Sequence, residues 1–140
     1  MKTTKQQREE LVARAVEAKK QAYAPYSNFR VGAAVLMDDG SIFEGCNVEN
    51  ASYGLTICAE RNAIFHAVFS GKKKITAVAV TSDDEQFLTP CGACRQVISE
   101  FADENTNIIL TTVRGDVRIV KFEKLFPTPP DLKKLTKRKK

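Results

Sequence analysis

Long apolar runs, histidine and cysteine are all scarce in this chain of 140 residues. No segment approaches the roughly 18 consecutive apolar residues of a membrane-spanning helix, and the polar N-terminal residues are unlike a signal peptide. The four cysteines would allow two disulfides in a secreted protein, but without a secretion signal their thiols fit a reducing compartment better. We therefore expect a cytoplasmic protein that does not span a membrane.

The chain also lacks a basic domain, although its formal net charge is +5. Six positive charges fall within residues 133–140, and the rest of the chain has 16 basic and 17 acidic residues, a net charge of −1. A near-neutral domain does not predict a nucleic-acid-binding face. We expect residues 1–132 to form one domain and residues 133–140 a solvated, disordered tail. The alternative for this tail is a weak hold on RNA, a membrane or an acidic partner.

Three cysteines and one glutamate form the most informative pattern in the sequence. Cys58-Ala59-Glu60 is followed by Pro90-Cys91-Gly92-Ala93-Cys94, and Cys91 comes 33 residues after Cys58. Three thiolates can hold Zn²⁺ and leave its fourth tetrahedral position open to water, which zinc makes more acidic. The Glu60 carboxylate beside that position can move protons. C-x-E followed by P-C-x-x-C is typical of zinc enzymes that deaminate a base.

A closed structural zinc site is the alternative, and it needs a fourth protein ligand. Only Cys46 and His66 are left to supply one. His66 lies eight residues after Cys58 on the same predicted helix, roughly 12 Å along its axis, which is too far to share the ion. The sequence leaves Cys46 open as a ligand.

Three helices are predicted from caps and helical spacing. The first begins at a capping box of Thr4 with Gln7 and runs to about Tyr23. The second runs from about Cys58 to Ser70, where Gly71 stops it. The third follows Thr89-Pro90 and carries Cys91 and Cys94. Their expected buried residues are Leu11, Ala15, Ala18 and Ala22 in the first, Ala63, Ile64, Ala67 and Val68 in the second, and Val97, Ile98 and Phe101 in the third.

Five strands alternate with these helices. They are expected at 30–37, 42–48, 75–81, 107–112 and 117–122. Asp39-Gly40 is a hairpin signal between the first two. The link that contains Gly115-Asp116 is too short for a parallel crossover, so the last two strands are predicted to be antiparallel. Five strands with helices on both faces indicate an α/β fold.

The chain resembles the cytidine deaminase family, in its branch that acts on free nucleosides. The resemblance runs from about Leu11 to Pro127 and rests on four segments, which are 25–34, 45–53, 57–61 and 90–96. It implies a three-layer α/β/α sandwich around a mixed five-stranded sheet. It also implies one Zn²⁺ per subunit, held by Cys58, Cys91 and Cys94, and hydrolysis of cytidine and deoxycytidine in pyrimidine salvage.

The same resemblance assigns roles to further residues. Glu60 is implied as the proton shuttle, and Arg61 as a hydrogen-bond donor to the zinc thiolates, with Arg95 as a second candidate beside them. Residues implied to contact the nucleoside are Phe29 at the base, Asn47 and Glu49 at the sugar, and Ala51, Tyr53 and Ala59 around them. A carboxylate at the sugar end would repel a phosphate, so a free nucleoside is expected rather than a nucleotide.

The family's assembly is a homotetramer with active sites shared between subunits, and the resemblance implies the same here. One segment departs from the family pattern. Family members place a phenylalanine a few residues after the proline that matches Pro127, and a neighbouring subunit stacks it on the base. The segment Phe126-Pro127-Thr128-Pro129-Pro130-Asp131 lacks that aromatic, and Phe126 is the remaining candidate.

Two other functions stay open from the sequence. One is a zinc-stabilised RNA-binding module, in which Cys46 closes the site and the basic tail binds RNA. The other keeps the chemistry but acts on a base within RNA or DNA, or on a modified nucleoside. The near-neutral domain and the acidic sugar site argue against a polynucleotide, whose binding rests on phosphate contacts.

Overall fold

Strand β3 (Ile75–Ser82) lies in the middle of a mixed five-stranded sheet. The computed structural model describes residues 3–132, and in it the strand order is β2-β1-β3-β4-β5. The other strands are β1 (Val31–Met37), β2 (Ile42–Cys46), β4 (Asn107–Thr111) and β5 (Val117–Lys121). Only the β3–β4 pair is parallel among these neighbours. The predicted antiparallel pairing of the last two strands is confirmed.

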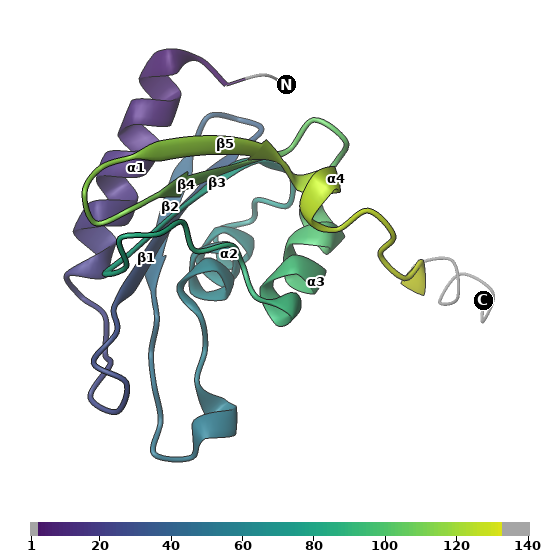
Figure 1. Ribbon diagram of the computed structural model, residues 1–140. Helices are drawn as coiled ribbons and strands as arrows, with labels where there is room; N and C mark the ends of the chain where they lie inside the picture. The colour runs from purple at the N-terminus through teal and green to yellow at the C-terminus, as the bar shows by residue number, and fades with distance from the viewer. Residues whose placement is uncertain (1–2, 133–140) are drawn as a thin grey trace.

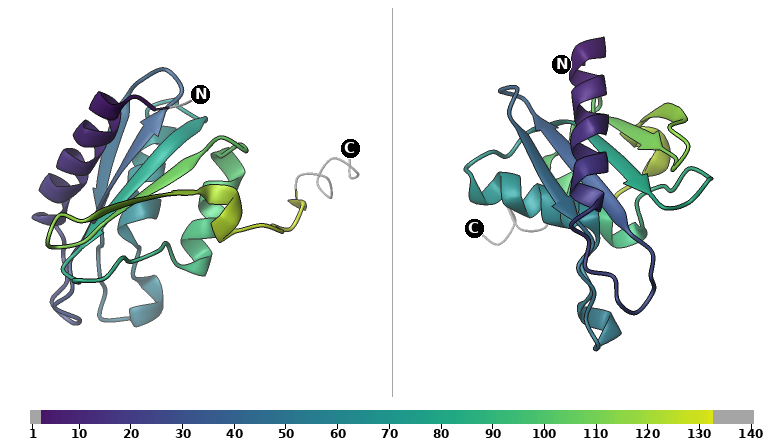
Figure 2. Two further views of the ribbon diagram at one scale, coloured as in Figure 1. Left: turned by 45° about the horizontal axis from the view of Figure 1, so that its top comes forward. Right: turned by 90° about the vertical axis from the view of Figure 1, so that its left-hand side faces the viewer.

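Helices cover both faces of this sheet, which confirms the three-layer α/β/α arrangement (Figures 1 and 2). Helix α1 (Lys5–Lys19) packs on one face, and α2 (Ala59–Phe69) and α3 (Gly92–Phe101) pack on the other. Side chains of β1 alternate between the two layers, as strand geometry requires. Ala34 and Leu36 face α1, whereas Val35 and Met37 face α2 and α3.

Helix α1 begins as predicted and ends earlier than predicted. The backbone N–H of Gln7 donates to Thr4 Oγ1 at 3.1 Å, and Gln7 Oε1 accepts from the Thr4 N–H at 2.9 Å, so the capping box is confirmed. Extension of the helix to Tyr23 is wrong. The Tyr23 N–H donates to the Asn47 carbonyl at 3.0 Å, and its carbonyl accepts from the Glu49 N–H at 2.8 Å. Pairing with a distant segment therefore replaces the last helical turn.

The two helices that carry cysteines begin at those cysteines. Cys58 is the N-cap of α2, and Cys91 is the N-cap of α3. Helix α2 ends at Phe69, and Gly71 follows in the left-handed region with φ 87°, as the C-terminal signal predicts. The predicted core residues Ala63, Ile64 and Ala67 are fully buried.

Gly45 on β2 lets α2 approach the sheet closely. A Cβ atom at Gly45 would lie 2.3 Å from the backbone nitrogen of Ala63 and 2.7 Å from the carbonyl oxygen of Ala59. No side chain larger than hydrogen fits without moving the helix. Gly45 therefore fixes the height of α2, and with it the positions of Cys58 and Glu60 above the sheet.

The remaining differences from prediction lie at element ends and in loops. Strand β2 ends at Cys46 instead of 48, and the predicted loop 49–56 contains a short 3₁₀ helix, η1 (Tyr53–Leu55). A short helix α4 (Phe122–Leu125), which was not predicted, follows β5. Within residues 3–132, no helix has the length and apolar character needed to cross a membrane. The expected basic tail, residues 133–140, lies outside the described residues.

Candidate active site

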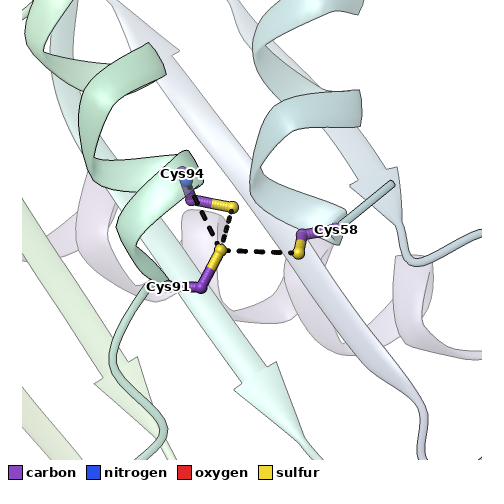
Figure 3. A group of neighbouring side chains, drawn as sticks. All are labelled: Cys58, Cys91 and Cys94. Atoms are coloured by element: carbon purple, nitrogen blue, oxygen red, sulfur yellow. Dashed lines mark hydrogen bonds between the residues drawn. The ribbon is translucent and has the colours of Figure 1, made fainter. Parts of the chain in front are cut away.

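The Sγ atoms of the three motif cysteines converge between the first turns of α2 and α3 (Figure 3). Cys58 Sγ lies 3.7 Å from Cys91 Sγ, and Cys91 Sγ lies 3.4 Å from Cys94 Sγ. All three atoms lie within 4.8 Å of one another. Cys91 also accepts a hydrogen bond from the Cys94 backbone N–H at 3.4 Å, which fixes the turn that presents both thiols.

This geometry fits a zinc ion. Zn–S bonds of about 2.3 Å at tetrahedral angles place neighbouring sulfur atoms about 3.8 Å apart. The observed separations are close to that value, so the three thiols need only small movements to share one ion. Both helix N-termini point their partial positive charge at these sulfurs, which favours the thiolate form that zinc requires.

No fourth protein ligand joins the three cysteines among residues 3–132. Cys46 lies outside the cluster, and its side chain is half-buried. His66 is exposed, and its Nδ1 lies 3.2 Å from the Glu44 carbonyl while its ring packs edge-on against Phe43. A closed structural site is therefore not supported, and the fourth position is left for water or substrate.

Arg61 supplies the positive charge that three thiolates need. Its Nη2 lies 3.5 Å from Cys58 Sγ. The Cys94 thiol is the largest cause that lowers the pKa of Cys58, to about 5, and the Arg61 guanidinium and Cys91 lower it further although burial opposes them. Within residues 3–132 the buried Nε of Arg61 has no hydrogen-bond partner, and the contact of the guanidinium with the sulfur cluster runs from Nη2 to Cys58.

Glu60 lies in the first turn of α2 and is only 4 % exposed. Burial raises the pKa of its carboxyl to about 7, and the nearby Cys58 sulfur adds to the increase, while its own backbone N–H and Arg61 oppose it. A carboxyl group with a pKa near neutrality can both accept and release a proton. Such a group beside an open metal position is suited to hydrolytic chemistry.

A hollow of about 170 Å³ opens in front of these groups. Its lining includes Cys58, Glu60 and Cys91, together with Asn47 and Ala59 from the predicted set. Thr56, Leu88 and Thr89 also line it, and the sequence did not single them out. The only available signal was that Leu88 and Thr89 directly precede the second cysteine motif.

A second hollow, of about 360 Å³, adjoins the first at Thr56 and holds Glu49. Its other lining residues are Tyr26, Ser27 and Tyr53. Glu49, which was predicted to contact the sugar, therefore lies beside the hollow that Glu60 lines rather than within it. Tyr53 is 75 % exposed and Ala51 is also exposed, so within one chain neither is enclosed around a ligand.

The side chain of Asn47 is hydrogen-bonded to the backbone of Phe29. Asn47 Nδ2 donates to the Phe29 carbonyl at 2.9 Å, and Asn47 Oδ1 accepts from the Val31 N–H at 2.9 Å. The amide thus spans the start of β1. Phe29 is half-buried and packs against the core layer of α2 and α3.

Arg95 occupies a different place from the one expected beside the thiolates. Its Nε donates to the Pro90 carbonyl at 2.8 Å, its Nη1 to the Leu125 carbonyl at 2.9 Å, and its Nη2 approaches Thr89 Oγ1 at 3.3 Å. The side chain bonds oxygen atoms and no cysteine. It instead ties the metal-binding loop to the end of α4.

Phe126, the candidate for a base-stacking aromatic, packs against other residues of its own chain. It is half-buried, packs against the core, and its ring centroid lies 6.2 Å from that of Phe122. These contacts hold the side chain against its own chain.

Comparison with known proteins agrees with this site. Residues 5–110 match the family model of the cytidine and deoxycytidylate deaminase zinc-binding region. The chain is 49 % identical over 119 residues to the cytidine deaminase of Sporosarcina psychrophila, covering 85 % of this chain and 88 % of that one. The relative from Halalkalibacterium halodurans is 47 % identical over 120 residues, covering 86 % and 91 %.

Solved structures of cytidine deaminases are also similar to this chain. The crystal structure of cytidine deaminase from Burkholderia pseudomallei superposes with a TM-score of 0.84 at 45 % identity, covering 91 % of this chain and 100 % of that one. The structure from Mycobacterium tuberculosis gives 0.76 at 39 % identity, covering 86 % and 94 %. The chain belongs to the cytidine and deoxycytidylate deaminase family.

Proposed function

We propose that this protein hydrolyses cytidine and deoxycytidine to uridine and deoxyuridine, with release of ammonia. One observation carries the proposal: a buried glutamate, Glu60, lies two residues after Cys58 beside three converging thiols that no fourth protein ligand completes within residues 3–132. Relatives that share about half of the aligned residues are named cytidine deaminases, which supports the same reaction here.

The three cysteines, Glu60 and Arg61 have different proposed roles in the reaction. Cys58, Cys91 and Cys94 would hold Zn²⁺, which when bound would lower the pKa of a water molecule so that it loses a proton readily and can attack the base. Glu60 would accept one proton of the attacking water and deliver it to N3 of the cytosine ring. It would then carry the remaining proton of the new C4 hydroxyl group to the amino group, which leaves as ammonia. Arg61 keeps Cys58 in the thiolate form.

The nucleoside would lie across the two adjoining hollows. We assign the base to the hollow of Glu60, with Phe29 and the Ala59 backbone beside it, and the sugar to the region of Asn47 and Glu49. Hydrogen bonds from Ser27 are the largest cause that holds the pKa of Glu49 below its usual range, so the carboxylate is charged at neutral pH. That charge favours sugar hydroxyl groups and disfavours a 5′-phosphate.

We also infer that the protein acts as a homotetramer in the cytoplasm, with the loop of Ala51 and Tyr53 completing a neighbour's site. Leu55 in the same loop is 65 % exposed, which supports contact with another subunit. Light scattering coupled to gel filtration measures the assembly. A tetramer agrees with the inference, and a stable monomer with full turnover contradicts it.

Ultraviolet absorbance tests the reaction. Zinc-replete protein is incubated separately with cytidine, deoxycytidine and cytidine monophosphate. We expect conversion of both nucleosides while the nucleotide is spared. Unchanged absorbance of all three, with zinc bound stoichiometrically, contradicts the proposed function.

A further inference from the structure

Ser27 lies where the proposed sugar-binding and base-binding residues meet. Its hydroxyl donates to Glu49 Oε2 and accepts a hydrogen bond from the Phe29 backbone N–H at 3.0 Å. The backbone N–H groups of Ser27 and Tyr26 donate to Glu49 Oε1 at 3.1 and 3.0 Å. One short side chain thus contacts a residue two positions away and another 22 positions away.

Counting acceptor positions shows what is left of Glu49 for a ligand. A carboxylate offers about four lone-pair positions. Two backbone N–H groups occupy Oε1, and the Ser27 hydroxyl occupies one position on Oε2. About one acceptor position on Oε2 remains free, and the bond from Ser27 decides its direction. Without that bond the carboxylate can rotate, and ordering it on binding costs entropy.

The same hydroxyl holds the turn that presents Phe29. Asn28 has φ 55°, a left-handed conformation that side-chain-bearing residues rarely adopt. The Asn28 N–H donates to the Ala24 carbonyl at 3.0 Å, and Ser27 Oγ caps the next N–H, that of Phe29. Asn47 Nδ2 holds the Phe29 carbonyl from the other side. The aromatic ring and the carboxylate are therefore positioned by one connected network.

We propose that Ser27 is a positioning residue that directs the free acceptor of Glu49 toward the sugar hydroxyl groups and ties it to Phe29 at the base. This inference rests on the proposed function and adds a determinant of sugar recognition to it. Ser27 itself does not contact the reacting atoms. Its loss should therefore weaken binding through the sugar and leave the chemical step nearly intact.

The experiment compares Ser27→Ala on two substrates, cytidine and 2′,3′-dideoxycytidine, which lacks the 2′ and 3′ hydroxyl groups of the sugar. Removing a hydrogen bond to a charged group should lower kcat/KM for cytidine about tenfold, mostly through KM. The loss for the dideoxynucleoside should be less than about threefold, because it has no 2′ or 3′ hydroxyl group to donate a hydrogen bond to Glu49. Ser27→Thr, which keeps a hydroxyl, should restore most of the cytidine activity.

Controls separate positioning from general damage. Ser41→Ala removes a comparable exposed hydroxyl, which contacts Asp39 in the β1–β2 turn at 2.5 Å, and should change neither substrate. Zinc content and Tm are measured for every variant. Ser27→Gly is a second hydroxyl-free variant, to be used if Ser27→Ala fails to fold.

Each possible outcome either supports the inference or overturns it. A loss confined to cytidine, with zinc and Tm unchanged, supports the inference. An equal loss on both substrates, or no loss on either, overturns it while the proposed function stands. Absence of turnover by the unmodified protein overturns the proposed function, and this inference with it.

Discussion

The Nη2 atom of Arg61 lies 3.5 Å from the Sγ atom of Cys58, so a guanidinium faces one of three clustered thiols. Three thiolates around a divalent cation carry a formal charge of −1, which weakens the cation as a Lewis acid. The arginine compensates for this charge from the same helix that supplies Cys58 and Glu60. The proposed metal ligand Cys58, the proposed proton shuttle Glu60 and Arg61 thus lie within a single helical turn.

Replacing this cation should weaken metal binding. Arg61→Gln removes the charge that helps lower the pKa of Cys58, and loss of such an outer contact typically costs about 10- to 100-fold in metal affinity. Competition with a chromogenic chelator measures the zinc affinity. Arg8→Gln on α1, where the side chain donates to the carbonyl and hydroxyl oxygens of Thr3, is the matched control. Equal zinc affinity in both variants would rule out this role for Arg61.

Glu60→Gln should separate metal binding from turnover. The amide has the same shape but cannot take up the proton, so kcat should fall by at least about 100-fold while zinc stays bound. Metal content by mass spectrometry and uridine formation are measured on one preparation. Glu123→Gln makes the same change in the exposed first turn of α4 and should be silent. Substantial turnover by Glu60→Gln would remove Glu60 from its assigned role.

Arg95 should contribute mainly to stability. Arg95→Met keeps the apolar stem but leaves the carbonyls of Pro90 and Leu125 without their charged donor. We expect a loss of about 2 kcal/mol in the free energy of unfolding, measured by urea titration. Arg114→Met, which removes an exposed ion pair with Glu85, should cost less than about 1 kcal/mol. A smaller loss for Arg95→Met than for Arg114→Met would contradict this assignment.

Asp83 should contribute to stability in acid. Burial alone would raise the pKa of its carboxyl, but hydrogen bonds from Arg30 and Lys19 outweigh burial and lower the pKa to about 2. Since the folded pKa is below the unfolded value, the stabilisation is complete above about pH 4 and is lost as the pH falls toward about 2. It amounts to something on the order of 2 kcal/mol.

Urea titrations between pH 2 and about pH 6 compare the unmodified protein with Asp83→Asn. The difference in unfolding free energy between the two should be largest near neutrality and shrink through the acid range. Asp38→Asn in the exposed β1–β2 turn is the matched control. A difference that does not change with pH would exclude the titration of Asp83 as its cause.

The sequence predicts the metal centre well because its signal is local. Cysteines at the starts of two helices bring their thiols to one point once the helices pack on the same face of the sheet. Spacing and caps indicate both helices, and the short link at Gly115 predicts the antiparallel pairing of β4 with β5. These features depend on neighbours in sequence, which a pattern can report.

Contacts between distant segments are the part that the sequence does not reveal. Tyr23 leaves its helix to pair with the strand extension at Asn47 and Glu49, and no local propensity signals that exchange. Arg95 reaches Leu125, 30 positions away, instead of the adjacent thiols. Ser27 looks like an ordinary turn residue until the fold brings Glu49 to its hydroxyl. Side-chain direction, which decides these roles, depends on tertiary packing rather than on residue spacing.

The central claim is an open three-cysteine zinc site that performs the deamination, and a metal titration tests it most directly. Protein stripped of metal under reducing conditions is given increasing zinc, and uridine formation from cytidine is followed. We expect no turnover without metal, and a rate of uridine formation that rises linearly with added zinc and saturates at one equivalent per chain. Turnover that is independent of zinc, or one bound zinc per chain without any turnover, would contradict it.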